Sequence, residues 1–135
     1  MINLWHFLKS AAEGGYDAYC GIGFIYTYQK GLGVPKSLEK AFHYFRVAAD
    51  NGIGMAQYFT GIWYINGKGV DKDISLTIKY LSLGADQNYM DAAVFLPALL
   101  IVESDRDSSY LFQAIYRIKC AIKIIKKTDE NFKDF

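Results

Sequence analysis

Cysteine and proline are scarce in this sequence. The chain of 135 residues contains two of each, and its cysteines, Cys20 and Cys120, stand 100 positions apart. That spacing fits neither a zinc-binding pair nor a CxxC redox site, so we predict no metal and no cofactor. Two separate thiols in a reducing compartment are expected, and one long-range disulfide is the alternative.

Targeting and membrane-spanning signals are also missing. The N-terminal stretch has no basic segment ahead of its apolar part, and that part contains His6 and Lys9, which a signal peptide avoids. No apolar run approaches the roughly 18 residues that a transmembrane helix requires. We therefore expect a cytoplasmic protein that does not enter a membrane.

The sequence also has no large excess of positive or negative charge. The formal net charge is +1, whereas a dedicated nucleic-acid binder needs a basic surface that displaces counterions. Nucleic acid is therefore not an expected partner. Apolar residues make up 52% of the chain, which argues against disorder, and the length fits a single domain.

What the sequence does contain is an internal repeat. A shift of 36 residues places Tyr28 on Tyr64, and it pairs further residues in the same way: Gly31 with Gly67, Gly33 with Gly69, Val34 with Val70, Tyr44 with Tyr80 and Ala49 with Ala85. A shift of 37 aligns Ala11, Ala12 and Gly15 with Ala48, Ala49 and Gly52. Periods of this length are typical of helical units that stack on one another.

Each unit is predicted to form two helices. Apolar residues recur at helical spacing from Met55 to Asn66, and the Gly-x-Gly-Val segment after them breaks the helix. Asp73 can cap the helix that follows, as Ser37 can cap the helix from Leu38 to about Asp50. A strand over residues 24–28 agrees with β-propensity alone, but the helical period of the equivalent residues argues against it. The turn glycines are Gly31, Gly33, Gly67 and Gly69.

These residues resemble the Sel1-like repeat. The resemblance rests on the block Ala48-Ala49-Asp50-Asn51-Gly52, on Ala56, Gln57, Tyr58 and Gly61, and on the turn after Tyr64, and it covers about residues 4–100. A tetratricopeptide repeat has a similar shape but a period of about 34 residues and no Gly-x-Gly-Val turn. The resemblance implies an all-α fold, a short right-handed solenoid of antiparallel helix pairs with about seven helices and a long C-terminal capping helix.

A single domain is expected over residues 1–135, divided into five segments. They are a partial N-terminal helix (1–13), repeat one (about 11–47), repeat two (about 48–83), a degenerate third repeat with the cap (about 84–127) and a tail (128–135). In the third repeat Pro97 takes the position of Gly61. Because a proline inside a helix costs roughly 3 kcal/mol, a kink or break is expected near residues 93–97.

The last helix is expected from about Ser109 to Lys127. Its residues fall into an apolar stripe of Leu111, Ile115, Ile118, Ile122 and Ile125 and a basic stripe of Lys119, Lys123, Lys126 and Lys127. A solvated face is the expected role of the basic stripe, and contact with an anionic partner is the alternative.

The resemblance implies that the first helix of each pair lines a concave face that binds partners. The candidate partner-binding residues on this face are Phe24, Tyr28, Met55, Tyr58, Ile62, Ile65, Val94 and Ile101. The middle helix is apolar almost all round, so it is either buried on every side or open to a partner. Two interpretations remain: an open groove, or one covered by the C-terminal helix or by tight curvature of the short stack.

No set of residues predicts an enzyme. His6 and His43 occupy equivalent repeat positions, and helices one repeat apart would hold them roughly 10 Å from each other, too far to share a metal. The Gly-x-Gly segments lack the lysine and hydroxyl residue of a P-loop and follow no strand. No catalytic residue is therefore expected.

The expected function is to bind another protein through the concave groove. One form, bacterial in style, is an adaptor in a signalling or secretion complex, and another is an immunity-type inhibitor that blocks a cognate toxin. The near-neutral charge gives such an inhibitor no electrostatic steering toward a basic toxin. A self-associating structural module, present as a homodimer, is the alternative, and an enzyme with its pocket in the groove is a third.

Overall fold

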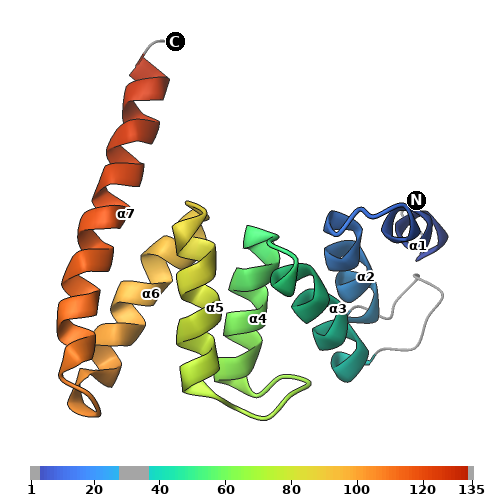
Figure 1. Ribbon diagram of the computed structural model, residues 1–135, viewed down its shortest axis with the longest axis horizontal. Coiled ribbons are helices and arrows are strands. Elements are labelled where there is room, and N and C mark those ends of the chain that lie inside the picture. Colours follow the sequence, from blue (N-terminus) through green and yellow to red (C-terminus); the bar gives the residue numbers. More distant parts are fainter. Residues whose placement is uncertain (1–3, 28–36, 134–135) are drawn as a thin grey trace.

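The computed structural model describes residues 4–27 and 37–133. These residues form no strand and seven α-helices: α1 (Leu4–Ala12), α2 (Asp17–Thr27), α3 (Leu38–Asp50), α4 (Gly54–Asn66), α5 (Ile74–Asp86), α6 (Met90–Val102) and α7 (Ser109–Lys133). A short 3-10 helix, η1 (Glu103–Asp105), lies between α6 and α7. Each α-helix contacts the helices before and after it in sequence. Figure 1 shows them in a row from the N-terminus to the C-terminus. The prediction of an all-α solenoid is confirmed.

Two capped helices mark the repeat. Ser37 Oγ accepts a hydrogen bond of 3.2 Å from the N–H of Lys40 at the start of α3, and Asp73 Oδ1 accepts one of 3.0 Å from the N–H of Leu76 at the start of α5. Both capping residues have the extended backbone that an N-cap requires. The predicted caps and the starts of both helices are confirmed, 36 residues apart.

The turn between α4 and α5 needs its two glycines for different reasons. Gly67 ends α4 in the left-handed conformation, with φ 63°, and its N–H donates to the carbonyl of Trp63. Gly69 also has a positive φ, 69°, and a Cβ there would overlap the carbonyl oxygen of Leu38 at the start of α3. The turn of one repeat therefore packs against the preceding repeat. The predicted turn glycines of the first repeat, Gly31 and Gly33, lie outside the described residues, as does the candidate binding residue Tyr28.

In the pairs α2/α3 and α4/α5 the two helices approach closely at a glycine. A Cβ added to Gly61 of α4 would lie 3.1 Å from Leu81 Cγ, and one added to Gly23 of α2 would lie 2.9 Å from the Phe45 ring. Phe45 and Leu81 are both fully buried and stand 36 positions apart. The glycines leave space for these larger side chains to fill the centre of each pair.

Helix α6 runs unbroken through Pro97, so the expected break does not occur. Pro97 has no N–H to bond the carbonyl of Ala93, which weakens the helix at this point. Pro97, Ala93, Leu96 and Leu100 are all buried. Tertiary packing of these apolar residues stabilises the helix across the missing hydrogen bond.

Helix α7 ends at Lys133, beyond the predicted end near Lys127. Residues 128–133, predicted to form a tail, contain no glycine or proline and continue the helix. Since α7 has 25 residues and α6 has 13, α7 extends past its neighbour by about 18 Å, and Figure 1 shows it projecting at the C-terminal end of the stack. None of the described helices, this one included, has the length and apolar character needed to cross a bilayer.

Candidate protein-binding surface

The first helices of the three pairs, α2, α4 and α6, carry the candidate residues, and we call the surface they share the A-helix face. On α2 the ring of Phe24 meets the rings of Phe45 and Phe59 edge-on, with centroids 5.2 Å apart in both pairs. Such edge-to-face pairs contribute about 0.5–1.5 kcal/mol beyond burial alone. Phe24 is half-buried, so it joins α2 to α3 and α4 and still presents part of its side chain to solvent.

The four candidate residues of α4 divide into two groups. Met55 and Ile62 pack, partly buried, against the apolar cluster formed by α2 to α5. Tyr58 and Ile65 pack instead against the cluster formed by α5 to α7, and the Tyr58 ring lies 5.6 Å from that of Tyr89, just before α6. The following repeat therefore covers Tyr58 and Ile65.

The C-terminal helix does not cover the middle helix, which was one of the two interpretations of the sequence. Helix α7 packs along α6 and η1 at the end of the stack, and Figure 1 shows α5 and α6 between α7 and α4. Tyr58 and Ile65 of the middle helix are thus partly covered by the next helix pair and not by a cap that folds back over them.

The two candidate residues of α6 are exposed. Val94 and Ile101 stand 36 positions after Tyr58 and Ile65, but their side chains are 55% and 48% exposed. They point to the side on which a following repeat would pack, and no further first helix follows α6 within the described residues. The A-helix face is therefore half-buried over α2 and α4 and open over α6.

Three exposed aromatic residues of the pair α6/α7 were not among the predicted binding residues. Phe95, Phe112 and Tyr116 are 37%, 74% and 62% exposed. Apolar periodicity alone assigns such residues to a core, because it does not show whether a neighbouring repeat covers them. The available signal was the loss of the Gly-x-Gly-Val turn after α6, which marks this pair as the last regular one in the repeat pattern.

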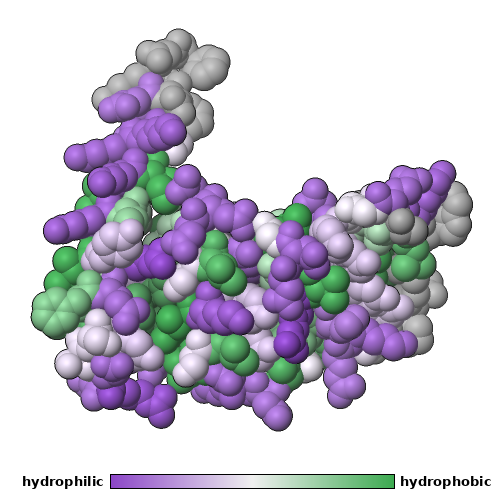
Figure 2. Space-filling view, in the orientation of Figure 1, coloured by the Kyte–Doolittle hydropathy of each residue, from purple (hydrophilic) through white to green (hydrophobic). Residues whose placement is uncertain are grey.

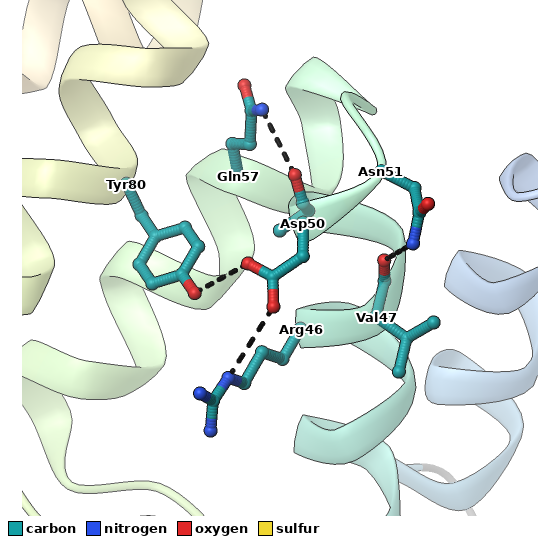
Figure 3. Close-up of polar contacts among 7 residues, drawn as sticks. Arg46, Val47, Asp50, Asn51, Gln57 and Tyr80 are labelled. Carbon is teal, nitrogen blue, oxygen red and sulfur yellow. Dashed lines mark hydrogen bonds and ion pairs between the residues drawn. The ribbon is translucent and has the colours of Figure 1, made fainter.

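Polar side chains fix how successive pairs stack (Figure 3). Tyr80 Oη donates a hydrogen bond of 2.7 Å to Asp50 Oδ1, and Arg46 Nε lies 3.7 Å from Asp50 Oδ2. Burial and, after it, the bond to Asp50 raise the pKa of Tyr80 to about 12. The phenol therefore stays neutral near pH 7 and keeps donating to the carboxylate.

Gln57 makes a second polar link at the start of α4. Its amide donates to the carbonyl oxygen of Ala49 at 3.1 Å (Figure 3), and its Oε1 accepts a hydrogen bond of 2.8 Å from the amide of Gln87. These two bonds connect the end of α3, the start of α4 and the end of α5. A face held in one arrangement in this way loses little conformational entropy when it binds a partner.

The titratable groups that sequence analysis considered for chemistry are dispersed. In the described part of the chain, no group of three or more His, Cys, Asp or Glu side chains is placed to hold a metal ion. His6 and His43 are both exposed. Both cysteines are free thiols, as predicted, and burial raises the pKa of Cys20 to about 11, which keeps that thiol protonated and unreactive.

Two surface clefts hold carboxylates that already have partners. A cleft of about 470 Å³ at the start of α5 includes Asp73, and one of about 260 Å³ between the end of α5 and α7 includes Asp86; neither contains a histidine. Asp73 caps α5, and Asp86 Oδ1 lies 2.6 Å from Arg117 Nη1. Both carboxylates are therefore engaged in structural contacts.

Sequence comparison matches the chain to the Sel1 repeat over residues 17–53 and 54–89, more than half of its length. Each matched segment corresponds to one helix pair, α2 with α3 and α4 with α5. The chain is 42% identical over 55 residues to "ERAD-associated E3 ubiquitin-protein ligase component HRD3B" of Arabidopsis thaliana and 31% identical over 98 residues to "DAP3-binding cell death enhancer 1" of Rattus norvegicus. These alignments cover 40% and 72% of this chain but only 9% and 18% of those proteins.

Solved structures share the fold over most of the chain. A Sel1 repeat protein from Oxalobacter formigenes superposes with a TM-score of 0.74 at 25% identity, covering 90% of this chain and 49% of that one. The protein c5321, a protective antigen present in uropathogenic Escherichia coli strains, superposes with a TM-score of 0.73 at 22% identity, covering 87% of this chain and 24% of that one.

Proposed function

The chain belongs to the Sel1 repeat family, and from this premise we propose that it binds another protein through the A-helix face. Sel1 repeat proteins typically mediate protein–protein interactions. The single observation that carries the proposal for this chain is the exposure of Val94 and Ile101 on α6. Contiguous exposed apolar side chains are unfavourable in water and mark surfaces that a partner covers.

The half-buried residues of the earlier helices extend this surface. Phe24 on α2 and Met55 and Ile62 on α4 are partly accessible, and Ala98, 36 positions after Ile62, is exposed on α6. An aromatic and aliphatic row of this kind supplies the few buried anchors that dominate binding energy in protein interfaces. The polar links through Asp50 and Gln57 hold the row in place before the partner arrives.

An adaptor in the cytoplasm is the form of the proposal that we favour. Two relatives carry names that describe work within protein complexes, one as a component of a ubiquitin ligase and one as a DAP3-binding protein. The immunity-type inhibitor remains a narrower form of the same proposal. With a net charge of +1, the chain has no long-range attraction for a basic toxin, whereas an adaptor needs none.

Affinity capture from the native host tests the proposal. The tagged chain is compared with Val94→Asp/Ile101→Asp, which places charge on the exposed part of the face and leaves buried residues intact. Leu83→Asp is the matched control, because Leu83 is 39% exposed on α5, outside this face. One stoichiometric partner retained by the control and lost by the double variant supports the proposal.

The other outcomes of this capture separate the alternatives. A partner that is toxic when expressed alone identifies the inhibitor form. Equal capture by all three proteins would remove the A-helix face from the account. Capture of a second copy of the chain alone, abolished by the double variant, would replace the proposed function with self-association.

A further inference from the structure

Helix α7 turns its most regular apolar stripe to solvent. Leu111, Ile115, Ile118, Ile122 and Ile125 are each 40–47% exposed, and they follow one another at spacings of four and three residues. The helix packs on the body with a neighbouring face, on which Ala114 and Ala121 are buried and Tyr110 and Ile124 are partly buried. We call the exposed set the α7 stripe.

The same positions are covered by a helix in both preceding repeats. The second helix of each pair has a fully buried residue on its inner side, Phe45 in α3 and Leu81 in α5. The residues three positions before and four positions after it lie at the boundary with the next pair. In α3 these are Phe42 and Ala49, which are 6% and 1% exposed in the cluster that includes residues of α4.

Helix α5 repeats the arrangement, and α7 departs from it. Ile78 and Ala85 of α5 pack in the cluster that includes residues of α6. Counted in the same way from Ala114, which is 0% exposed, the positions in α7 are Leu111 and Ile118, at 47% and 40%. The α7 stripe is therefore the surface to which each earlier repeat binds a helix, here without one in the described chain.

Apolar residues at alternating spacings of four and three residues form the surface through which two helices pair side by side. The stripe from Leu111 to Ile125 is about 21 Å long, which a helix of about 14–16 residues would cover. Figure 1 shows α7 at the end of the row of helices, with α6 on one side and no described helix on the other. The occupant that fits this surface is a single amphipathic helix.

Charge determines which kind of helix fits. Lys119 and Lys126 lie one turn after Ile115 and Ile122 and so form the edge of the stripe away from α6. Lys123 lines the cleft between α5 and α7 instead, and neither Lys119 nor Lys126 forms an ion pair within the described residues. Figure 2 shows hydrophilic residues along the projecting part of α7 and apolar residues lower on the same helix.

We propose that the α7 stripe and its lysine edge bind an amphipathic helix of another protein whose apolar face is bordered by Asp and Glu. The acidic border would pair with the lysines that have no partner, while the apolar residues cover the isoleucines. Two copies of the chain paired along α7 in antiparallel orientation would instead place both lysine edges on the same side, where like charges repel. The α7 stripe and the A-helix face share no residue, since Val94 and Ile101 lie on α6.

The test uses two synthetic helical peptides of about 16 residues, both with isoleucines at the same alternating spacing of four and three. One carries Glu along one edge and the other carries Lys there. Binding is followed by fluorescence anisotropy at low and high salt. We expect the Glu peptide to bind at least about tenfold more tightly than the Lys peptide, with the difference shrinking at high salt.

Variants of the full chain define the site. Ile118→Asp should weaken binding of the Glu peptide at least about tenfold, whereas Leu83→Asp should leave it unchanged. Lys119→Glu/Lys126→Glu, at two exposed positions, leaves every packed residue in place and should reverse the preference in favour of the Lys peptide. Val94→Asp/Ile101→Asp should leave peptide binding intact, so that failure of the A-helix proposal is distinguished from failure of this one.

Other results would overturn the inference. These are no binding of either peptide, equal binding of both, or no reversal by the double charge variant. A dimer in sedimentation equilibrium that Ile118→Asp dissolves would assign the stripe to a second copy of the chain. Binding to phosphatidylserine vesicles that Ile118→Asp abolishes, without any preference between the peptides, would assign it to a membrane surface.

Discussion

The hydroxyl of Tyr80 donates a 2.7 Å hydrogen bond to the carboxylate of Asp50, and this bond joins α5 of one repeat to the end of α3 in the repeat before it. Tyr80 is 3% exposed, so its hydroxyl has little water to bond in place of Asp50. The second carboxylate oxygen, Asp50 Oδ2, lies 3.7 Å from Arg46 Nε. The stack therefore depends on a charge-assisted bond between repeats as well as on apolar packing.

Tyr80→Phe should lower the free energy of unfolding by about 1–2 kcal/mol, because it removes a bond to a charged acceptor and leaves the ring in place. Urea denaturation measures the loss. A double-mutant cycle with Asp50→Ala should give a coupling energy of about 1 kcal/mol. Strictly additive losses would show that the bond contributes nothing beyond the two side chains separately.

Alkaline pH should destabilise the fold in two stages. Folding raises the pKa of Cys20 from 9.0 to about 11 and that of Tyr80 from 10.0 to about 12. Each group binds its proton more tightly when folded, so its contribution is complete below the unfolded pKa and is lost as pH rises through the folded pKa. The free energy of unfolding should fall from about pH 9 upward.

Two variants assign those stages in urea titrations at successive pH values. Cys20→Ala should remove the part of the decline between about pH 9 and 11, and Tyr80→Phe the part between about pH 10 and 12. A stability that stays flat to pH 11 in the unmodified chain would contradict the account of both groups.

Two fully buried threonines should respond in opposite ways to the same substitution. The hydroxyl of Thr60 has no hydrogen-bond partner, whereas that of Thr77 lies 3.0 Å from the carbonyl oxygens of Gly61 and Asp73 and donates there. Thr60→Val should raise the free energy of unfolding by up to about 1 kcal/mol, and Thr77→Val should lower it by about 1–2 kcal/mol. Equal changes in thermal or urea unfolding would contradict this difference.

The turn glycines should differ in their tolerance of alanine. At Gly67 a Cβ meets Lys72 at 3.6 Å, an ordinary contact, so Gly67→Ala should cost only the strain of the positive φ, about 1 kcal/mol. At Gly69 the Cβ would also collide with the Leu38 carbonyl, and the backbone must move. Gly69→Ala should therefore lose at least twice as much stability, and a smaller loss than for Gly67→Ala would refute the packing of this turn.

Local rules predicted much of this fold correctly. The 36-residue period located the caps Ser37 and Asp73, and both helices begin where these caps placed them. Gly61, one of the residues on which the family resemblance rests, lies against Leu81 at the centre of its helix pair. These features depend on residues near one another in sequence or at the repeat spacing, so the pattern contains them.

Other features depend on contacts that no local pattern records. The break expected at Pro97 is absent because burial of α6 outweighs the missing hydrogen bond. On α7, the regular isoleucine stripe reads as a core face, yet the helix packs through Ala114 and Ala121, whose small side chains allow close approach to α6. Which candidate residues a neighbour covers, Tyr58 but not Val94, follows from their place in the stack.

Photo-crosslinking in host cells tests the central claim, protein binding by the A-helix face, most directly. A photo-reactive phenylalanine analogue is placed at position 62 or 101, on that face, or at position 83 on α5 as the control. The account predicts one discrete heavier adduct, with the same partner protein, from positions 62 and 101 and none from position 83. Adducts from position 83 alone, or no adduct from either position on the face, would contradict it.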